Sequence, residues 1–364
     1  MTMQRLSFRA ATAITAMLAG TVTLASSSGA GTTGERIAAA AAVGENVTAV
    51  GADSFANISI SFPDGVRGLP DITYQTLNGY RPMKLDLYLP PARFDSAAPR
   101  PWVMYIHGGG WMGGGPRRSA AYLDWPRVLA SLAARGYVVA SASYRFSREA
   151  PFPAQIQDVK AAIRWLKANA ATYHLDVNRG MTWGQSAGGH LAALVAVSCG
   201  VAAFSPPARV VPKTATVELQ ASTAAGADQQ SDCVQGAVAW FGVYDFSKMP
   251  QADATVKTLL GCGDAVCPPE KLLAASPIHY VDTKDPPMLI MHGAEDALVP
   301  LAQSQQFHAA LLAAGVPSRL IVVPAVGHSW IGKTAVATQS ASRNSLAQAI
   351  DFIDATIGDR PKQH

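Results

Sequence analysis

The feature that most constrains the fold is an alternation of short apolar runs with segments of helical periodicity. We expect the apolar runs to be buried strands, and they lie at 102–106, 137–141, 181–183, 238–243, 288–291 and 320–323. Apolar residues recur at helical spacing at 125–135, 155–168, 187–197 and 346–357. An earlier alternating run at 85–89, ended by two prolines, predicts an antiparallel strand. The sequence therefore predicts an α/β fold with a mostly parallel central sheet and helices on both faces.

The composition excludes several classes of protein. The chain has 364 residues, of which 49% are hydrophobic, so it can bury a large core and is not intrinsically disordered. Strictly apolar runs all fall short of about 18 residues, which excludes a protein that spans the membrane several times. The net charge is only +4 and is dispersed along the chain, so we expect no nucleic-acid partner.

The first thirty residues have the order of a secretory signal peptide. Arg5 and Arg9 precede an apolar stretch at 10–24 whose only polar members are threonines, and small residues follow. We therefore expect residues 1–30 to be removed on export, which leaves a secreted or periplasmic protein without a membrane anchor. Residues 31–70 are rich in Ala, Gly, Thr and Ser and lack periodicity, so we expect a linker or an N-terminal arm. The folded domain is expected at 71–364.

Export favours disulfides over free thiols. The four cysteines, Cys199, Cys233, Cys262 and Cys267, permit three pairings. We favour Cys262 with Cys267, which closes a tight local loop, and Cys199 with Cys233, which joins the ends of a long one. Loop-closure entropy gives these two bonds about 2 and about 4 kcal/mol of stabilisation. Zinc is the competing interpretation, but the chain has neither a paired C-x-x-C nor a helical histidine pair, so we expect no metal.

A Gly-Gln-Ser-Ala-Gly-Gly sequence at 184–189 lies between a predicted strand and a predicted helix. In that context the pattern is typical of a nucleophile elbow, in which glycines leave room for a sharply turned serine. The turn would expose the Ser186 hydroxyl and direct the helix N-terminus, with the Ala187 amide, at an anion formed beside it. An ordinary glycine-rich turn with an incidental serine is the alternative.

A second glycine-rich motif, His-Gly-Gly-Gly-Trp at 107–111, also follows a predicted strand. Three successive glycines leave their amides unobstructed, so these amides can converge on a carbonyl oxygen as an oxyanion hole. A phosphate-binding loop is less favoured, because the Gly-Lys-Ser/Thr ending of a P-loop and the spacing of a dinucleotide fingerprint are both missing. We expect His107 to be structural and Trp111 to form a pocket wall.

Two further polar groups follow strands, in the chain order serine, aspartate, histidine. Asp296 comes after the strand at 288–291, and His328 after the strand at 320–323. His328 can remove the Ser186 proton at neutral pH, and Asp296 can fix the tautomer of that histidine. Glu295 is the alternative acid and Asp245 a less favoured one. The remaining histidines of this region, His292 and His308, are expected to be structural or at the surface.

From about residue 70 to 358 the chain resembles the α/β-hydrolase superfamily. Within it, the chain is similar to bacterial esterases of the bifunctional acetylxylan/feruloyl group, near the hormone-sensitive-lipase-like enzymes. The likeness is carried by Tyr144-Arg145 and by the stretches at 152–159, 184–190 and 286–300. The resemblance implies an α/β-hydrolase fold and a catalytic triad of Ser186, Asp296 and His328. It also implies oxyanion-hole donors among Gly109, Gly110, Trp111 and Ala187.

The chain departs from this group at several places. Gln185 stands where relatives often have Gly, Asp or Glu, and with Trp111 it is a candidate substrate contact. The long loop at 199–233 and the cysteine-bearing segment at 245–285 are larger departures, and both could border the site.

These observations predict a secreted serine carboxylesterase that works through an acyl-enzyme and needs no cofactor. The family likeness implies short-acyl or hydroxycinnamoyl esters, either small molecules or esters linked to polysaccharide. An arylformamidase or a peptidase with the same triad is the alternative, although the large propeller of prolyl oligopeptidases is missing. A non-catalytic interaction protein ranks last, because all three triad residues are present.

Overall fold

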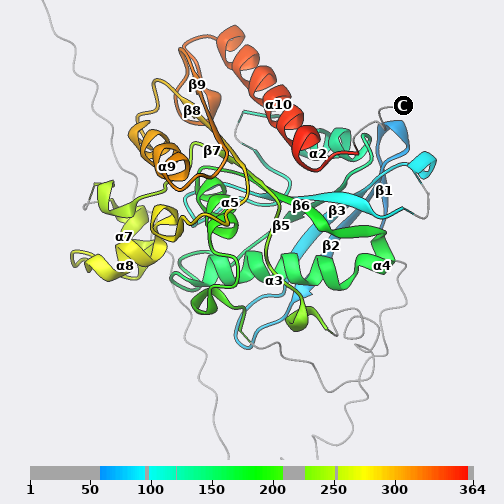
Figure 1. Ribbon diagram of the computed structural model, residues 1–364, viewed down its shortest axis with the longest axis horizontal. Coiled ribbons are helices and arrows are strands. Elements are labelled where there is room, and N and C mark those ends of the chain that lie inside the picture. Colours follow the sequence, from blue (N-terminus) through cyan, green and yellow to red (C-terminus); the bar gives the residue numbers. More distant parts are fainter. Residues whose placement is uncertain (1–57, 95–97, 120, 208–225, 251–252, 360–364) are drawn as a thin grey trace, which may run out of the picture. The chain divides into compact units, whose positions relative to one another are not determined.

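The computed structural model describes residues 58–94, 98–119, 121–207, 226–250 and 253–359, all within one compact unit (Figure 1). The signal peptide expected at 1–30 and the part of the expected arm at 31–57 lie outside the described residues.

Within the described residues, nine strands form a single sheet in the order β1-β2-β3-β5-β4-β6-β7-β8-β9. The strands are β1 (Ile60–Ser61), β2 (Arg67–Gln75), β3 (Met83–Leu89), β4 (Arg100–Ile106), β5 (Val138–Ala142), β6 (Leu175–Gln185), β7 (Ala237–Trp240), β8 (Met288–Gly293) and β9 (Ser318–Val323). Every neighbouring pair from β5 to β9 is parallel, whereas β1, β2 and β3 run antiparallel to their neighbours. The mostly parallel sheet and the early antiparallel strand are therefore confirmed.

The sheet begins earlier than the sequence pattern indicates. Strands β1 and β2 start at Ile60 and Arg67, inside the segment expected to be a linker or arm. The sequence does not show a regular strand pattern for β2, because this strand contains a proline and pairs irregularly with β3 between Leu69 and Ile72. There Asp71 adopts a positive φ of 59°, and its amide donates a hydrogen bond to the Asp86 carboxylate. The domain boundary at residue 71 is therefore wrong by at least eleven residues, since β1 begins at Ile60.

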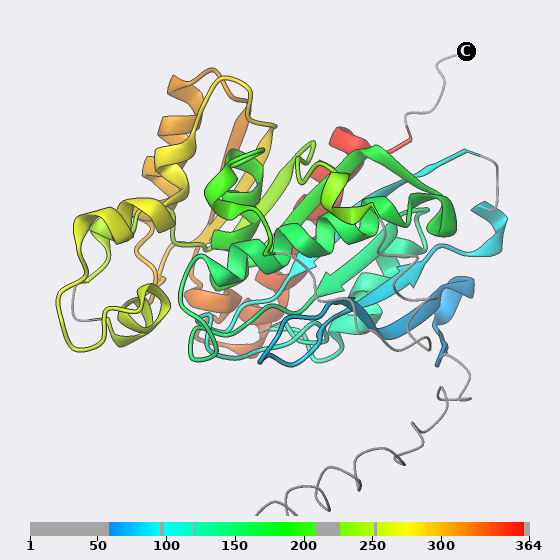
Figure 2. The ribbon, with the colours of Figure 1, turned by 90° about the horizontal axis from the view of Figure 1, so that it is seen from below.

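Helices cover both faces of the sheet, as the sequence predicts. The helices in the described part of the chain are α2 (Trp125–Ala133), α3 (Ala154–Ala168), α4 (Ala170–Tyr173), α5 (Ala187–Val197), α7 (Ala254–Leu260), α8 (Pro269–Ala275), α9 (Ala302–Ala313) and α10 (Ala335–Ile357). Figures 1 and 2 show α3 and α10 on opposite sides of the sheet. Short 3-10 helices also occur, one of them at His328–Trp330.

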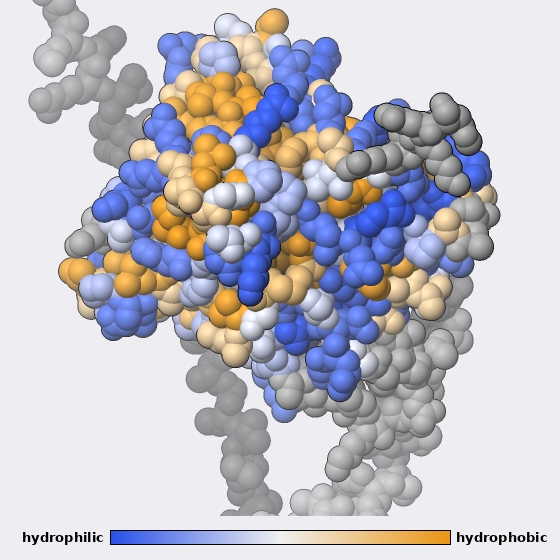
Figure 3. Space-filling view, viewed as in Figure 1, coloured by the Kyte–Doolittle hydropathy of each residue, from blue (hydrophilic) through white to orange (hydrophobic). Residues whose placement is uncertain are grey.

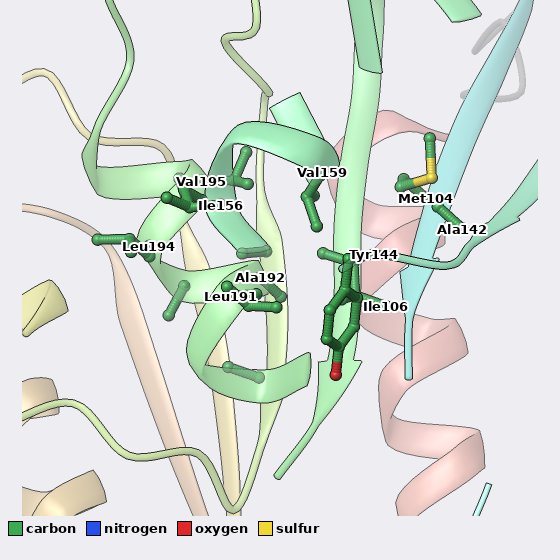
Figure 4. Packing of buried hydrophobic residues seen from close by; sticks show 14 of the residues in the cluster. Met104, Ile106, Ala142, Tyr144, Ile156, Val159, Leu191, Ala192, Leu194 and Val195 are labelled. Atoms are coloured by element: carbon green, nitrogen blue, oxygen red, sulfur yellow. The ribbon is translucent and has the colours of Figure 1, made fainter. Parts of the chain in front are cut away.

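The hydrophobic core divides into two clusters because successive strand residues point to opposite faces. In β4, Met104 and Ile106 pack with α3 and α5, whereas Val103 and Tyr105 pack with α2 and α10. Figure 4 shows the first cluster, in which side chains of α3 and α5 lie against this face of the sheet. All residues of α5 are buried. This helix therefore lies fully inside the protein and holds the sharp turn at its N-terminus in place.

Both favoured disulfides are present: Cys199 is bonded to Cys233, and Cys262 to Cys267. The first bond joins the ends of the long loop, whose Cα atoms are 4.8 Å apart. A buried ion pair lies beside this disulfide. The Lys160 ammonium group of α3 donates to the Asp232 carboxylate at 2.9 Å and to the Ser198 carbonyl oxygen. The loop ends are thus fixed both covalently and by an ion pair.

No helix in the described part of the chain combines the length and the apolar character needed to cross a membrane. Some apolar side chains are nevertheless exposed, among them Leu312 of α9 and Val322 of β9. Figure 3 shows apolar surface at the end of the molecule where these two elements lie.

Candidate active site

Ser186 occupies a sharp turn between the last residue of β6 and the first residue of α5. Its φ of 53° and ψ of −121° are unfavourable for a residue with a side chain, and such a conformation costs about 1–3 kcal/mol. The surrounding glycines are required sterically. A Cβ atom on Gly184 would lie 2.1 Å from the Gly188 carbonyl oxygen, and one on Gly188 would lie 2.0 Å from that of Ile106. The structure thus has the strand–turn–helix geometry that the sequence predicts for this motif.

The ends of β8 and β9 place an aspartate and a histidine beside this turn. His328, which follows β9, has its Nε2 atom 2.9 Å from the Ser186 Oγ. Its Nδ1 atom lies 2.7 Å from Oδ2 of Asp296, which follows β8. The three residues that the sequence selects are therefore in one continuous hydrogen-bonded array.

Asp296 is held as a carboxylate. Its side chain is fully buried, and Oδ1 accepts hydrogen bonds from the amides of Leu298 and Val299, each at 2.9 Å. Burial alone would raise the pKa of Asp296, but hydrogen bonds from His292, His328 and the Val299 amide outweigh it and hold that pKa well below its usual value. The low pKa keeps Asp296 negatively charged opposite His328.

His292, which the sequence analysis expects to be structural or at the surface, is a buried structural residue beside Asp296. Its Nε2 lies 2.9 Å from the Val299 carbonyl oxygen and 3.3 Å from Asp296 Oδ2, and its Nδ1 is 2.6 Å from Ser304 Oγ. The ring is buried and fixes the loop that carries Asp296. Its place four residues before Asp296, at the end of the same strand, was the available signal.

The two alternative acids, Glu295 and Asp245, contact residues other than His328. Glu295 is exposed and lies 3.7 Å from the Lys333 ammonium group. Asp245 accepts hydrogen bonds from the amide and hydroxyl of Ser247, so it caps a short 3-10 helix. Asp296 is the acid whose carboxylate contacts His328.

The three-glycine loop lies beside Ser186. A Cβ built on Gly108 would be 3.3 Å from the Ser186 Cβ, and the next three residues, Gly109, Gly110 and Trp111, have φ of 121°, 59° and 56°. Within the described chain, no hydrogen bond engages the amides of Gly109, Gly110 or Ala187. Unpaired N–H groups beside a serine are what an oxyanion hole requires.

The side chains of His107 and Gln185, which flank these glycines and Ser186, make their polar contacts within the protein. His107 is buried, its ring stacks on Tyr144 at 4.4 Å, and its Nδ1 contacts the Gly108 carbonyl oxygen; burial lowers its pKa to about 4. This is the structural role expected from the sequence. Gln185 and Trp111, the candidate substrate contacts, are both buried. The Gln185 amide oxygen accepts a hydrogen bond from the Ser119 hydroxyl at 3.0 Å and is therefore occupied within the protein.

The cysteine-bearing segment borders this site. A Cβ on Gly110 would meet the Thr255 methyl group of α7 at 3.1 Å, and Phe246 packs against the Trp111 ring at 5.6 Å. Among the described residues, no three His, Cys, Asp or Glu side chains lie close enough together to hold a metal ion.

A mostly parallel sheet covered on both faces, with a serine elbow after β6 and an aspartate and a histidine after later strands, defines an α/β-hydrolase. Comparison with known families makes this more specific. The chain belongs to the BD-FAE family, whose model matches residues 85–311, more than half of its length.

Two similar proteins of known name are an esterase and a probable carboxylic ester hydrolase. Esterase LipQ of Mycobacterium tuberculosis is 33% identical over 219 residues, which are 59% of this chain and 46% of LipQ. A probable carboxylic ester hydrolase of the same organism, LipM, is 30% identical over 242 residues, covering 65% of this chain and 50% of LipM. The chain therefore spans about half the length of these curated relatives.

A similar solved structure is a truncated form of a carbohydrate esterase from gut microbiota. It has a TM-score of 0.64 and 27% identity, and the match covers 82% of this chain and 99% of the other. The bifunctional GH43-CE of Bacteroides eggerthii has the same TM-score at 31% identity, covering 82% of this chain and 36% of that one.

Proposed function

We propose that this protein is a serine carboxylesterase in which Ser186 is the nucleophile, His328 the general base and acid, and Asp296 the residue that orients His328. The observation that carries the proposal is the pair of contacts from His328, at 2.9 Å to Ser186 Oγ and 2.7 Å to Asp296 Oδ2. A carboxylate only accepts hydrogen bonds, so it places the proton of neutral His328 on Nδ1 and leaves Nε2 free to accept one.

In the acylation half of the reaction, the Ser186 Oγ forms a bond to the ester carbonyl carbon while its proton passes to His328 Nε2. The carbonyl oxygen becomes an oxyanion, and the amides of Gly109, Gly110 and Ala187, with that of Trp111 as a further candidate, donate to it. The bond from carbon to the alcohol oxygen then breaks, and His328 gives its proton to the departing alcohol. The product of this half is an acyl ester on Ser186.

In the deacylation half, water takes the place of the alcohol. His328 removes one proton from water as the oxygen attacks the acyl carbon, and the same amides hold the second oxyanion. Collapse releases the carboxylic acid and returns the proton to Ser186 Oγ. No metal ion or organic cofactor takes part in these steps.

We further infer that the substrates are short-acyl or hydroxycinnamoyl esters, of the acetyl or feruloyl type, either small or attached to plant polysaccharide. The similarity to a carbohydrate esterase and to GH43-CE supports a carbohydrate-linked alcohol. The signal-peptide pattern at 1–30 supports export, and two disulfides fit an oxidising compartment.

The proposal is tested by the hydrolysis of nitrophenyl esters from acetate upward and of methyl ferulate. The purified protein is compared with Ser186→Ala, and N-formylkynurenine is included as a formamidase substrate. We expect ester turnover that falls as the acyl chain lengthens and vanishes in the variant. Ester turnover that persists in Ser186→Ala would remove Ser186 from the mechanism. Turnover of the formamide alone would replace the esterase with an arylformamidase.

A further inference from the structure

His190 is a buried histidine that the proposed mechanism does not use. It lies in the first turn of α5, four residues after Ser186, and its ring is enclosed by Trp111, Phe246 and Phe152 at centroid distances of 5.4, 5.1 and 6.5 Å. Both ring nitrogens have partners. Nδ1 is 3.1 Å from the Trp111 Nε1, and Nε2 is 2.8 Å from the carbonyl oxygen of Ala275, the last residue of α8.

These partners define one protonation state. An indole N–H can only donate, so His190 Nδ1 must accept, and a carbonyl oxygen can only accept, so Nε2 must carry the proton. Burial also lowers the pKa of His190 to about 4, which keeps the ring neutral at ordinary pH. A histidine with both nitrogens occupied inside the protein is not available to exchange protons with a substrate.

The partner of His190 is a residue that needs to be held. Trp111 ends a run of three residues with positive φ, and it is the member of that run with a side chain, so its backbone conformation is unfavourable. Its carbonyl oxygen accepts a hydrogen bond from the Ser147 amide at 2.8 Å. The indole N–H bond to His190 is the second anchor of the same residue.

His190 also contacts the serine turn through its backbone. Its amide donates to the Ser186 carbonyl oxygen at 2.9 Å. One residue therefore joins the turn that carries the nucleophile, by its main chain, to the loop that carries the oxyanion donors, by its side chain. A side chain that only filled space in the core would not need a donor on one side and an acceptor on the other.

We propose that His190 is a positioning residue, which as the neutral Nε2–H tautomer holds Trp111 and so fixes the Gly109–Gly110–Trp111 loop relative to Ser186. This inference rests on the proposed esterase function. His190 acts on catalysis only through this loop. The loop must be in place before the oxyanion forms, because hydrogen-bond donors that first have to move stabilise the transition state less. Loss of the His190 bonds should therefore lower kcat and leave substrate binding nearly unchanged.

The kinetic test uses three single variants at His190 and Trp111, one double variant and one matched control. His190→Leu removes both bonds, and we expect kcat to fall by at least about 10-fold with KM within about two-fold of the original. His190→Gln keeps an oxygen acceptor and an N–H donor and should recover most of that loss. In Trp111→Phe, which has no indole N–H, adding His190→Leu should lower kcat little further. The control His308→Leu removes a histidine that contacts Ser318 at the opposite end of β9, and should leave kcat and KM unchanged.

A spectroscopic measurement separates this inference from the esterase proposal. Nitrogen-15 NMR of the histidine-labelled protein should show His190 as the Nε2–H tautomer between pH 6 and 8, and Trp111→Phe should shift its Nδ1 resonance. This readout does not depend on turnover, so it tests the two hydrogen bonds of His190 even if no ester is hydrolysed or if His190→Leu fails to fold. An Nδ1–H or doubly protonated ring would overturn the inference. So would an unchanged kcat in folded His190→Leu, a change in KM alone, or additive effects of the two substitutions.

Discussion

Replacing Ser186 by glycine should give a more stable protein than replacing it by alanine, although glycine is ordinarily the destabilising choice. Both variants lose the same hydroxyl and the same hydrogen bond to His328, so their difference isolates the backbone. Alanine retains a Cβ atom at φ 53° and ψ −121°, where a residue with a side chain carries about 1–3 kcal/mol of strain. Glycine adopts this conformation without that strain.

The expected magnitude follows from two opposing contributions. Glycine releases the strain, but its freer unfolded chain takes back about 0.4–1 kcal/mol. The net gain of Ser186→Gly over Ser186→Ala is therefore about 1 kcal/mol, which for a domain of this size raises Tm by about 2 °C. Thermal unfolding followed by circular dichroism, supported by urea titration, measures the difference directly. A Ser186→Gly protein that melts at or below Ser186→Ala would refute the claim that the turn stores strain.

Three other perturbations test the site and its support. Asp296→Asn should lower kcat by about 10³–10⁴-fold without unfolding the protein, as measured by steady-state kinetics and circular dichroism. The pKa of Asp296 is lowered in the folded protein, so its charge stabilises the native state above pH of about 4, and this contribution is lost as the pH falls further. In an acid titration of unfolding, the stability of Asp296→Asn should therefore depend less on pH in this range than that of the original protein. Identical acid profiles of the two proteins would contradict the assignment. Gly188→Ala places a methyl group 2.0 Å from a β4 carbonyl oxygen and should abolish folding or activity, whereas Gly115→Ala, with open space around it, should be silent in expression and activity assays. Replacing Cys199 and Cys233 together by serine should lower the free energy of unfolding, measured by urea titration, by up to about 4 kcal/mol. A decrease of less than about 1 kcal/mol would show that the buried ion pair of Lys160 and Asp232 is sufficient to fix the ends of the loop.

The positions of Ser186, Asp296 and His328 could be predicted because each comes shortly after an apolar strand. Parallel strands end at the same edge of a sheet, so residues distant in the chain are brought together by the topology alone. The glycines around Ser186 added a second, steric constraint. The favoured cysteine pairings were likewise recoverable, because one closes a tight local turn and the other closes a long loop.

Other elements left too little pattern in the sequence. Strand β1 has two residues, and helices α7 and α8 have seven each, which is less than two turns. Helix α10 begins at Ala335, eleven residues before the expected start at 346, because its first half is rich in Ala, Ser, Thr and Gln and shows no apolar stripe. A side-chain cap by Thr334 starts it instead.

The residues that contact and hold the site could not be predicted for a different reason. His292 contacts Asp296 and His190 contacts Trp111, and a sequence does not show which buried histidine meets which partner. His292 lies four positions before Asp296 and His190 four positions after Ser186, so proximity to a recognised motif is the signal that could have selected them.

The disulfide between Cys199 and Cys233 also makes this protein a convenient host for foreign sequence. Its two Cα atoms stay 4.8 Å apart, and Lys160 of α3 binds Asp232, the residue next to Cys233, so both ends of the connection are fixed at one point of the fold. Doubling the length of such a connection costs only about 0.6 kcal/mol of closure entropy. Phe204, which lies between the two cysteines, is part of the hydrophobic core, so a tag or an epitope inserted in this connection has to leave that residue in place.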